Sequence, residues 1–266
     1  MDNTGKVMFG SLFTGGGGAD MGLEAAGMKC AWQVENDKHC IAILQKRFPD
    51  IRRNKIGPCD GLVGGDPCPV RSVAGKIHGS SNPDLSGYFL AMVARCKPQW
   101  VLRENVIAPD VVEFQQGLEV LGYRCIIVKT NSAAVTGQRR SREWVVGFDQ
   151  QDTLDRFVRA CDECSGRART GEEKLLAKDE RLGTPLQCLT TRRHRMDLRD
   201  TLVYEGPQRG LRCLSHAERE RLQGWPTGWT EGVPHTARER IVGNGVTAPV
   251  AKWLGKRILE AICPPA

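Results

Sequence analysis

The residue best suited to nucleophilic chemistry in this sequence is a cysteine between two prolines. Cys68 stands in the segment Gly64–Pro69, directly after a short apolar run that predicts a strand. Because proline fixes the backbone angle φ, the thiol would project from a rigid turn at the end of that strand. An isolated cysteine is more often an inert, buried side chain, so the Pro67-Cys68 pair alone leaves both interpretations open.

An acidic residue and a group of arginines could assist such a nucleophile. Glu104 follows another short apolar run, and the segment Gln138–Arg142 contains Arg139, Arg140 and Arg142. A carboxyl group can donate or share a proton while a thiolate attacks. Taken separately, Glu104 has an ordinary explanation as part of a surface ion pair, and the arginines as a solvated basic turn. Together with Cys68 they favour a catalytic site.

A glycine-rich turn predicts a cofactor site. Phe13 and Thr14 precede four consecutive glycines, Gly15–Gly18, between a predicted strand and a predicted helix. Glycines let the backbone approach a ligand closely, and the helix N-terminus offers free N–H groups. Glu35 ends the next predicted strand, where an acidic side chain can accept hydrogen bonds from both ribose hydroxyls. An adenosine-containing cofactor fits, but NAD fits equally well, so a dehydrogenase and a plain flexible turn remain alternatives.

The elements that must position these residues alternate along residues 6–148. Predicted strands are Lys6–Phe13, Met28–Glu35, Gly61–Gly65, Gln99–Arg103, Tyr123–Thr130 and Glu143–Phe148, and predicted helices are Ala19–Ala26, Lys38–Phe48, Leu85–Cys96 and Val111–Leu121. This alternation predicts an α/β fold with a mostly parallel sheet and right-handed crossovers. We therefore expect a catalytic domain in residues 1–148, with its site at the carboxyl ends of the strands.

The pattern breaks down between residues 149 and 209, which are polar, charged and poor in aromatic residues. We expect an irregular small lobe there. After it, Leu214–Gln223 predicts a helix opened by Ser215, with Glu218 three residues later as in a capping box. Pro249–Ala261 predicts a final amphipathic helix. Residues 210–266 would return to the large lobe.

Composition restricts the class of protein further. With 40% hydrophobic and 26% charged residues in 266, the chain has the composition of a soluble globular protein. It has no apolar run of the roughly 18 residues that span a membrane, and no N-terminal pattern typical of secretion. Eleven cysteines without the spacing of a disulfide scaffold favour a reducing, cytoplasmic setting. The net charge of +7 suits a polyanionic partner, although solvated basic surfaces are common.

Six segments carry a resemblance to the DNA cytosine-5 methyltransferase family, bacterial or phage type, which covers nearly all of the chain except residues 149–209. In the family's order, they are Leu12–Gly18, Pro67-Cys68, Arg103–Val106, Gln138–Arg142, Glu220–Pro226 and Gly243–Val246. Each segment is a weak signal alone, but six in the family's order at workable spacing are very improbable by chance. The resemblance implies a Rossmann-like methyltransferase fold that binds S-adenosyl-methionine, with a small target-recognition lobe at 149–209.

The chemistry implied by the resemblance is methyl transfer to C5 of a cytosine in double-stranded DNA. Cytosine C5 is not nucleophilic enough to attack a sulfonium methyl, so the Cys68 thiolate would first add to C6. Glu104 would assist by a proton or a strong hydrogen bond at ring N3. By the same resemblance, Arg142 would hold the base oxygen O2, Arg140 would support the catalytic loop, and Asn105 would order the loop that carries Glu104.

The resemblance also implies the binding residues. Cofactor contacts would come from Phe13, Thr14, Gly15, Gly17, Gly18, Glu35, Asn36, Pro67, Asn244 and Val246. DNA contacts would come from Ser72, Gln138, Arg192, Arg193 and Arg195, since arginine can read guanine or neutralise phosphates. Because C6 is covered in a stacked duplex, the target cytosine would have to be flipped out. Residues 70–84 would close over the flipped base, or form an ordinary surface loop.

Three positions depart from the family's pattern. The segment Asn54–Ile56 lacks the acidic residue that contacts the adenine amino group, and Asp60 is the candidate replacement. Asn36 stands where an aromatic residue is frequent, and Gly245 where serine is frequent. These changes affect the expected adenine contacts and leave Cys68 and Glu104 in place.

Two further interpretations concern metal and substrate. Cys161 and Cys164 have the spacing of zinc ligands, with Cys188 and His194 able to complete a site, but we expect free cysteines and no metal. A close relative methylates cytosine in tRNA and carries a Cys-Phe-Thr sequence, which this chain lacks. A non-catalytic DNA-binding protein with the same fold is the third class. We expect a monomer without a protein partner.

Overall fold

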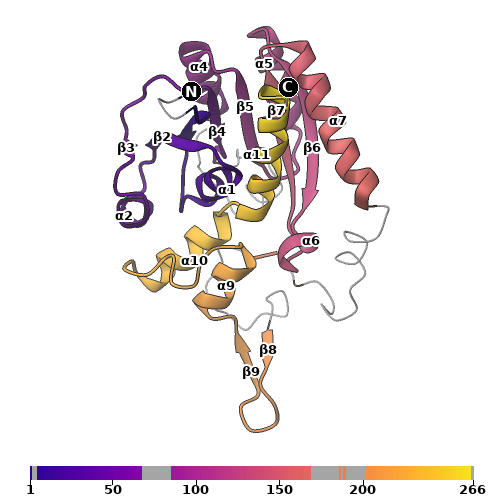
Figure 1. Ribbon diagram of the computed structural model, residues 1–266. Helices are drawn as coiled ribbons and strands as arrows, with labels where there is room; N and C mark the ends of the chain where they lie inside the picture. The colour runs from indigo at the N-terminus through magenta and orange to yellow at the C-terminus, as the bar shows by residue number, and fades with distance from the viewer. Residues whose placement is uncertain (2–4, 68–84, 169–185, 187, 190–201, 265–266) are drawn as a thin grey trace.

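A seven-stranded sheet forms the centre of the computed structural model, which describes residues 1, 5–67, 85–168, 186, 188–189 and 202–264, without the side chains of 163–168 (Figure 1). The strands are β1 (Met8–Leu12), β2 (Lys29–Val34), β3 (Arg52–Arg53), β4 (Gly61–Gly64), β5 (Trp100–Asn105), β6 (Arg124–Asn131) and β7 (Ser141–Phe148). Their order is β3-β2-β1-β4-β5-β7-β6. The five neighbouring strands β3, β2, β1, β4 and β5 pair in parallel. Strand β7 lies between β5 and β6 and is antiparallel to both. The predicted Rossmann-like sheet is confirmed.

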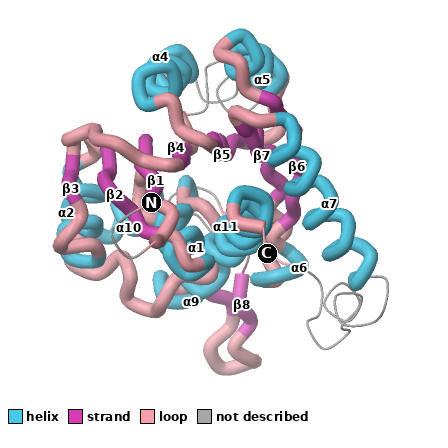
Figure 2. Tube along the Cα trace, turned by 45° about the horizontal axis from the view of Figure 1, so that its top comes forward, coloured by secondary structure: helices cyan, strands magenta, loops and turns pink. Residues whose placement is uncertain are grey.

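Helices cover both faces of this sheet, and Figure 2 shows α4 and α5 on one side and α1 and α11 on the other. On the first face lie α4 (Ser86–Cys96) and α5 (Asp110–Val120), and on the second α1 (Gly18–Ala26), α7 (Gln151–Ala168) and α11 (Ala248–Ile262). Phe89 and Phe114 pack into the first interface, and Leu23, Leu254 and Phe157 into the second. Burial on both faces explains why the strands read as continuous apolar runs rather than as alternating patterns.

The chain order of the strands reverses between β1 and β4, because β2 and β3 lie on one side of β1 and β4 and β5 on the other. In open α/β sheets, ligands bind outside the carboxyl ends of the strands at such a reversal. The predicted glycine turn follows β1, and the Pro67 turn follows β4. The topology therefore brings both predicted turns to one edge of the sheet.

The remaining elements gather at this same edge (Figure 1). They are α2 (Lys38–Arg47), α6 (Ala133–Thr136), α9 (His216–Leu222), α10 (His235–Asn244) and a hairpin of β8 (Leu202–Tyr204) and β9 (Leu211–Cys213). The predicted capping box at α9 is confirmed, since the Ser215 hydroxyl accepts from the Glu218 N–H and the Glu218 carboxylate accepts from the Ser215 N–H. The C-terminal part thus closes over the carboxyl edge.

The expectation of irregular structure from residue 149 is wrong for its first part. Residues 151–168 form α7, an 18-residue helix. Leu154, Phe157 and Cys161 share one face of it and pack into the core, where the Phe157 and Phe148 rings lie 5.5 Å apart. These residues recur at helical spacing, but charged residues dominate the segment and hide the narrow apolar stripe. α10 was likewise not predicted.

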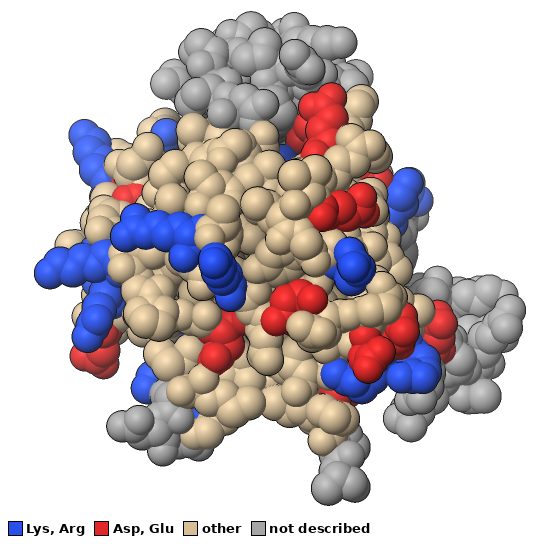
Figure 3. Space-filling model, turned by 90° about the horizontal axis from the view of Figure 1, so that it is seen from above, with Lys and Arg blue, Asp and Glu red and all other residues tan. Residues whose placement is uncertain are grey.

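The end of the molecule opposite this edge carries both signs of charge. Figure 3 shows Lys and Arg side chains interspersed with Asp and Glu over the amino ends of the strands, without a continuous basic surface. Among the described residues, no helix has both the length and the apolar character that a bilayer crossing requires.

A buried carboxylate joins β1, β2 and α1 beside the glycine turn. Asp20 is fully buried in the first turn of α1, where it accepts hydrogen bonds from Ser11 Oγ and Gln33 Nε2, each at 2.7 Å. Burial raises its pKa from 3.8 to about 6, against the opposing effect of the two hydrogen bonds. A proton on Asp20 is therefore bound more tightly in the folded state than in the unfolded state.

Asp20→Asn should change how stability depends on pH. In the wild type the free energy of unfolding should fall as pH rises from about 4 to about 6, because ionisation of Asp20 is disfavoured only in the folded state. The variant lacks this contribution, which amounts to about 3 kcal/mol at most. Urea unfolding of both proteins between pH 4 and 7 measures it as a pH-dependent difference. Two parallel stability curves would contradict the assignment.

Candidate active site

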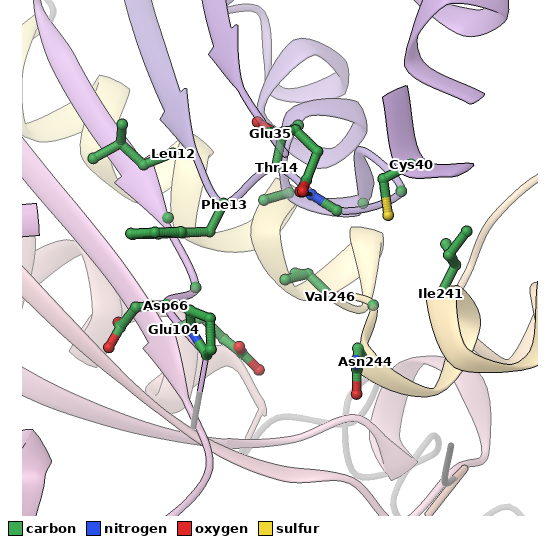
Figure 4. A pocket seen from close by; sticks show the side chains of 18 of the residues that line it. Leu12, Phe13, Thr14, Glu35, Cys40, Asp66, Glu104, Ile241, Asn244 and Val246 are labelled. Carbon is green, nitrogen blue, oxygen red and sulfur yellow. Dashed lines mark hydrogen bonds between the residues drawn. The ribbon is translucent and has the colours of Figure 1, made fainter. Parts of the chain in front are cut away.

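A cavity of about 360 Å³ lies at the carboxyl ends of β1, β4 and β5. The glycine turn lines it at one end and Glu104 with Arg142 at the other, so one space joins the predicted cofactor site to the predicted chemical site (Figure 4). Of the predicted residues, the lining contains Phe13, Thr14, Gly15, Gly18, Glu35, Asn36, Pro67, Glu104, Asn105, Arg140, Arg142, Asn244 and Val246. Thirteen of the fifteen predicted catalytic and cofactor-binding residues therefore lie on this wall.

The glycine turn is shaped by its contacts with the rest of the chain. Gly17 precedes α1 with φ of +81°, a conformation that favours glycine, and it packs on Phe48 rather than lining the cavity. At Gly18, a Cβ atom would lie 2.4 Å from the Val246 carbonyl oxygen, so any larger residue would push the two segments apart. The sequence of glycines is thus required by both geometry and close packing.

Glu35 binds this turn to the end of β2. Its Oε2 accepts from the Gly15 N–H at 2.7 Å, and its Oε1 accepts from the N–H groups of Asn36 and Asp37, each at 2.8 Å. The carboxylate is therefore held in one orientation at the cavity wall. A carboxylate has about four lone-pair sites, and these three bonds leave about one of them to accept a hydrogen bond from a ribose.

The chemistry of this wall fits an adenosine-containing cofactor. It combines backbone groups of the glycine turn, a fixed carboxylate for a ribose and the apolar side chains of Phe13 and Ile241.

The suggested adenine contact of Asp60 is wrong. Its carboxylate accepts from the N–H of Met8 and from the chain's amino terminus, at the amino end of β1 and away from the cavity. Asn36, which stands where an aromatic residue is frequent, does line the cavity.

Glu104 and Arg142 form the ion pair at the other end. Glu104 is the penultimate residue of β5 and is 8% exposed, and its Oε1 lies 2.9 Å from Arg142 Nε. The antiparallel pairing of β5 with β7 creates this contact, because it places Trp144 opposite Glu104 and so brings Arg142 alongside. An ideal Cβ on Gly65 would lie 3.3 Å from Glu104 Oε2, which shows how closely this carboxyl approaches the turn that leads to Pro67.

Arg140 joins two segments of the cavity wall by hydrogen bonds. Its Nη1 donates to Gly243 O at 3.1 Å and to Cys188 Sγ at 3.5 Å, and its Nη2 donates to Gly245 O at 2.9 Å. Burial, with Arg142 as a second cause, lowers the pKa of Arg140 to about 10, so the guanidinium stays charged at neutral pH. These bonds attach the residue before β7 to the C-terminal end of α10.

A buried ion pair fixes the turn before Cys68 to the end of β5. Arg103 donates to both carboxylate oxygens of Asp66, with Nη2 to Oδ2 at 2.7 Å, and to Asp110 at 2.9 Å. The Arg103 and Asp66 side chains are fully buried, and the guanidinium lies 4.5 Å from the Phe114 ring centroid. Burial acts to lower the pKa of Arg103, but the two carboxylates raise it above its ordinary value.

Asn105 strengthens the same connection. Its Nδ2 donates to Asp66 O at 3.5 Å, and its Oδ1 accepts from the Val106 N–H at 2.8 Å. These two bonds tie the end of β5 to the turn that leads to Pro67. Asp66 had not been singled out in the sequence, and its signal was its place next to Pro67-Cys68.

Gln138 does not have the expected access to DNA. Its side chain is fully buried, donating to Leu222 O at 2.8 Å and accepting from the Leu189 N–H at 2.9 Å. It therefore connects the β6–β7 turn to α9 instead of facing a ligand. Cys68, Ser72, Arg192, Arg193, His194 and Arg195 lie outside the described residues.

The cysteines considered as zinc ligands lie in different surroundings. Cys161 packs against the core on α7, whereas Cys188 contacts Arg140 near the cavity. The side chains of Cys164 and His194 lie outside the described part of the chain. Within that part, no three His, Cys, Asp or Glu side chains are grouped as a metal site would require.

A second ion pair at the cavity wall was not predicted from the sequence. Arg240 on α10 donates to the Asp37 carboxylate at 2.7 Å, and both residues line the cavity. Asp37 also caps α2 by accepting from the N–H groups of His39 and Cys40. The two partners are 203 residues apart, and no local pattern indicates that contact.

Known cytosine methylases resemble this chain over most of its length. The model of the family "C-5 cytosine-specific DNA methylase" matches residues 7–181 and 172–260. Type II methyltransferase M.BsuFI of Bacillus subtilis is 27% identical, over 97% of this chain and 73% of that protein. M.FnuDI of Fusobacterium nucleatum is 28% identical over 166 residues, and that match spans about half of either protein, 55% of this chain and 48% of M.FnuDI.

Two solved structures share the fold. The S. pombe Dnmt2 methyltransferase superposes with a TM-score of 0.73 over 97% of this chain and 100% of its own, at 14% identity. The Entamoeba histolytica methyltransferase EhMeth gives a TM-score of 0.70 over 97% and 99%, also at 14% identity. At such low identity these similarities show the fold alone.

Arg103→Met should destabilise the protein by about 3–5 kcal/mol, because it leaves the buried Asp66 carboxylate without its main partner. The double variant Asp66→Asn/Arg103→Met should lose less than the sum of the two single variants, since both charges are then absent. Lys129→Met, which breaks a pair whose lysine is 71% exposed, should cost only about 0–1 kcal/mol. Urea unfolding measures the free energy of unfolding of Arg103→Met, Asp66→Asn, the double variant and Lys129→Met. Strict additivity of the two single losses in the double variant would contradict the pairing.

Proposed function

Because the chain belongs to the C-5 cytosine-specific DNA methylase family, we propose that it methylates C5 of a cytosine in duplex DNA through a covalent bond between Cys68 and C6. The observation that carries the proposal is the single cavity that joins the glycine turn to Glu104 and Arg142. A methyl donor at one end and a base at the other would meet within it.

S-adenosyl-methionine is the proposed methyl donor, and it would supply an electrophilic methyl group. The glycine turn and the α1 N-terminus would bind it with backbone N–H groups, and Glu35 would accept a hydrogen bond from its ribose. Phe13, Val246 and Ile241 would pack against its apolar parts. Since the Glu35 carboxylate is already held by three backbone N–H groups, its orientation would not need to change on binding.

The base would react next to the Glu104–Arg142 pair. The Cys68 thiolate would add to C6, the electron pair of the C5–C6 double bond would form a C4–C5 double bond, and N3 would take up the proton shared by Glu104. C5 of the resulting enamine would then attack the sulfonium methyl group, whose carbon–sulfur bond breaks to leave a neutral thioether. Loss of the C5 proton to a base and departure of the Cys68 thiolate then restore the aromatic ring.

The ion pair gives Glu104 and Arg142 complementary roles. Arg142 Nε engages Oε1 of Glu104, which leaves Oε2, on the side of Gly65, for the ring nitrogen. Arg142 would offer its remaining N–H groups to the base oxygen O2. Arg140, whose donors are bound to Gly243 and Gly245, would support this arrangement rather than contact the base.

Duplex DNA is the proposed substrate, with the target cytosine flipped into the cavity. Ser72, Arg192, Arg193 and Arg195 are proposed DNA contacts. Since the first half of α7 packs into the core of the large lobe, we propose that the target-recognition region begins beyond this helix rather than at residue 149. The net charge of +7 supports a polyanionic partner.

Incubation with tritiated S-adenosyl-methionine and a cytosine-containing duplex tests the nucleophile. The wild type should transfer label to DNA, and Cys68→Ala should transfer none above background, because the C6 adduct cannot form. Cys263→Ala removes an exposed free cysteine and should keep full transfer. Equal labelling by Cys68→Ala and the wild type would reject the nucleophile. Label that appears in tRNA but not in DNA would reject the substrate, and DNA binding without any transfer would indicate a non-catalytic protein.

Glu104→Gln tests the second role. The amide keeps the size of the carboxyl group but cannot share a proton with N3, so the single-turnover methylation rate should fall by about 10²–10⁴-fold. Glu119→Gln, on the outer face of α5, should leave the rate unchanged. A Glu104→Gln rate within a factor of two of the wild type would exclude assistance at N3.

A further inference from the structure

Two tryptophan side chains from the C-terminal part hold the cofactor end of the cavity. Trp229 Nε1 donates to Gly16 O at 2.8 Å, and Trp225 Nε1 donates to Val246 O at 3.0 Å. Gly16 and Val246 both line the cavity, whereas neither tryptophan does. The indole groups therefore hydrogen-bond to wall residues without lining the cavity themselves.

Besides the packing of Gly17 on Phe48 and of Gly18 against Val246, hydrogen bonds hold the glycine turn in shape. Glycine has the greatest backbone freedom of any residue, so four in succession would adopt many conformations if unrestrained. Within the turn, Gly15 donates to Glu35 and the Gly17 N–H donates to Thr14 O at 3.0 Å. The carbonyl of Gly16 lies between these two points, and its orientation is set by the Trp229 indole.

Trp225 supports the same turn by packing. Its side chain is buried, and an ideal Cβ placed on Gly16, Gly18 or Gly245 would lie within 2.8 Å of its ring atoms. The ring thus fills the space between the glycine turn and the loop that leads to Val246. Its N–H bond to Val246 O fixes how the ring lies in that space.

Trp229 is itself fixed by a buried carboxylate. Glu220 on α9 accepts from the Gly228 N–H at 2.6 Å and the Thr230 N–H at 2.9 Å, on either side of Trp229. Arg238 also donates to Glu220, at 3.1 Å. Arg47 on α2 donates to Trp229 O at 2.9 Å, and its guanidinium lies 4.9 Å from the Trp229 ring centroid.

We propose that Trp225 and Trp229 are positioning residues for the methyl donor, which raise its affinity by holding the glycine turn and the Val246 loop in their binding shape. This inference rests on the proposed function, in which S-adenosyl-methionine occupies this end of the cavity. Without the indole bonds, the turn would have to be ordered when the cofactor binds, and that ordering would reduce the affinity. Glu220 acts one step further back, by fixing the segment that carries Trp229.

The test is the affinity of the DNA-free protein for S-adenosyl-methionine, measured by isothermal titration calorimetry. Trp229→Phe and Trp225→Phe keep an aromatic ring and remove the N–H donor, and each should raise Kd by about 5- to 10-fold, the effect of one lost hydrogen bond. Trp32→Phe is the matched control, because Trp32 is buried and donates to Gly57 O at 3.0 Å, outside the cavity lining. Its Kd should stay within a factor of two.

A second variant and a second measurement separate positioning from general loosening. Glu220→Gln should raise Kd in the same direction, whereas the affinity of all variants for a cytosine-containing duplex should match the wild type. If the wild type binds the cofactor and both Trp→Phe variants bind it equally well, the inference is wrong. An equal loss in Trp32→Phe would also overturn it. If the wild type itself does not bind S-adenosyl-methionine, the proposed function fails instead.

Discussion

The antiparallel pairing of β5 with β7 is the constraint on which the site depends. β5 is buried along its whole length, and it pairs with β4 on one side and with β7 on the other. Because side chains alternate along a strand, Arg103 points to one face of the sheet and Glu104 to the other. The first binds the turn that leads to Pro67, and the second meets Arg142 of β7. A shift of one residue in this register would exchange these two positions.

The fold could largely be predicted from the sequence, since buried strands and their helices give strong local patterns. The exceptions have physical causes. The polar residues Glu104 and Asn105 continue β5 beyond the expected end because ion pairs and hydrogen bonds replace apolar burial there. α7 was missed because its apolar stripe is narrow, and α10 because its buried residues pack in a cluster with side chains distant in the sequence, including Cys40 and Ile43 of α2.

The site was predictable where one short motif holds the residue, and not where two distant segments meet. The glycine turn, Glu35 and Glu104 all lie on the cavity wall as expected. Gln138 was misassigned because its motif is basic, yet its amide is used to join the β6–β7 turn to α9. Asp66–Arg103 and Asp37–Arg240 were not foreseen, since each pair forms only when the strands or helices are already in place.

The charged residues around the cavity are arranged differently at its two ends. At the cofactor end, Glu35 and Asp37 are held by backbone N–H groups, and Arg240 balances Asp37. At the other end, Arg142 pairs with Glu104, and Arg140 lies close enough to interact electrostatically with both. A positive site favours a thiolate over a thiol. If Cys68 reaches this end as proposed, Arg140 and Arg142 would favour its thiolate.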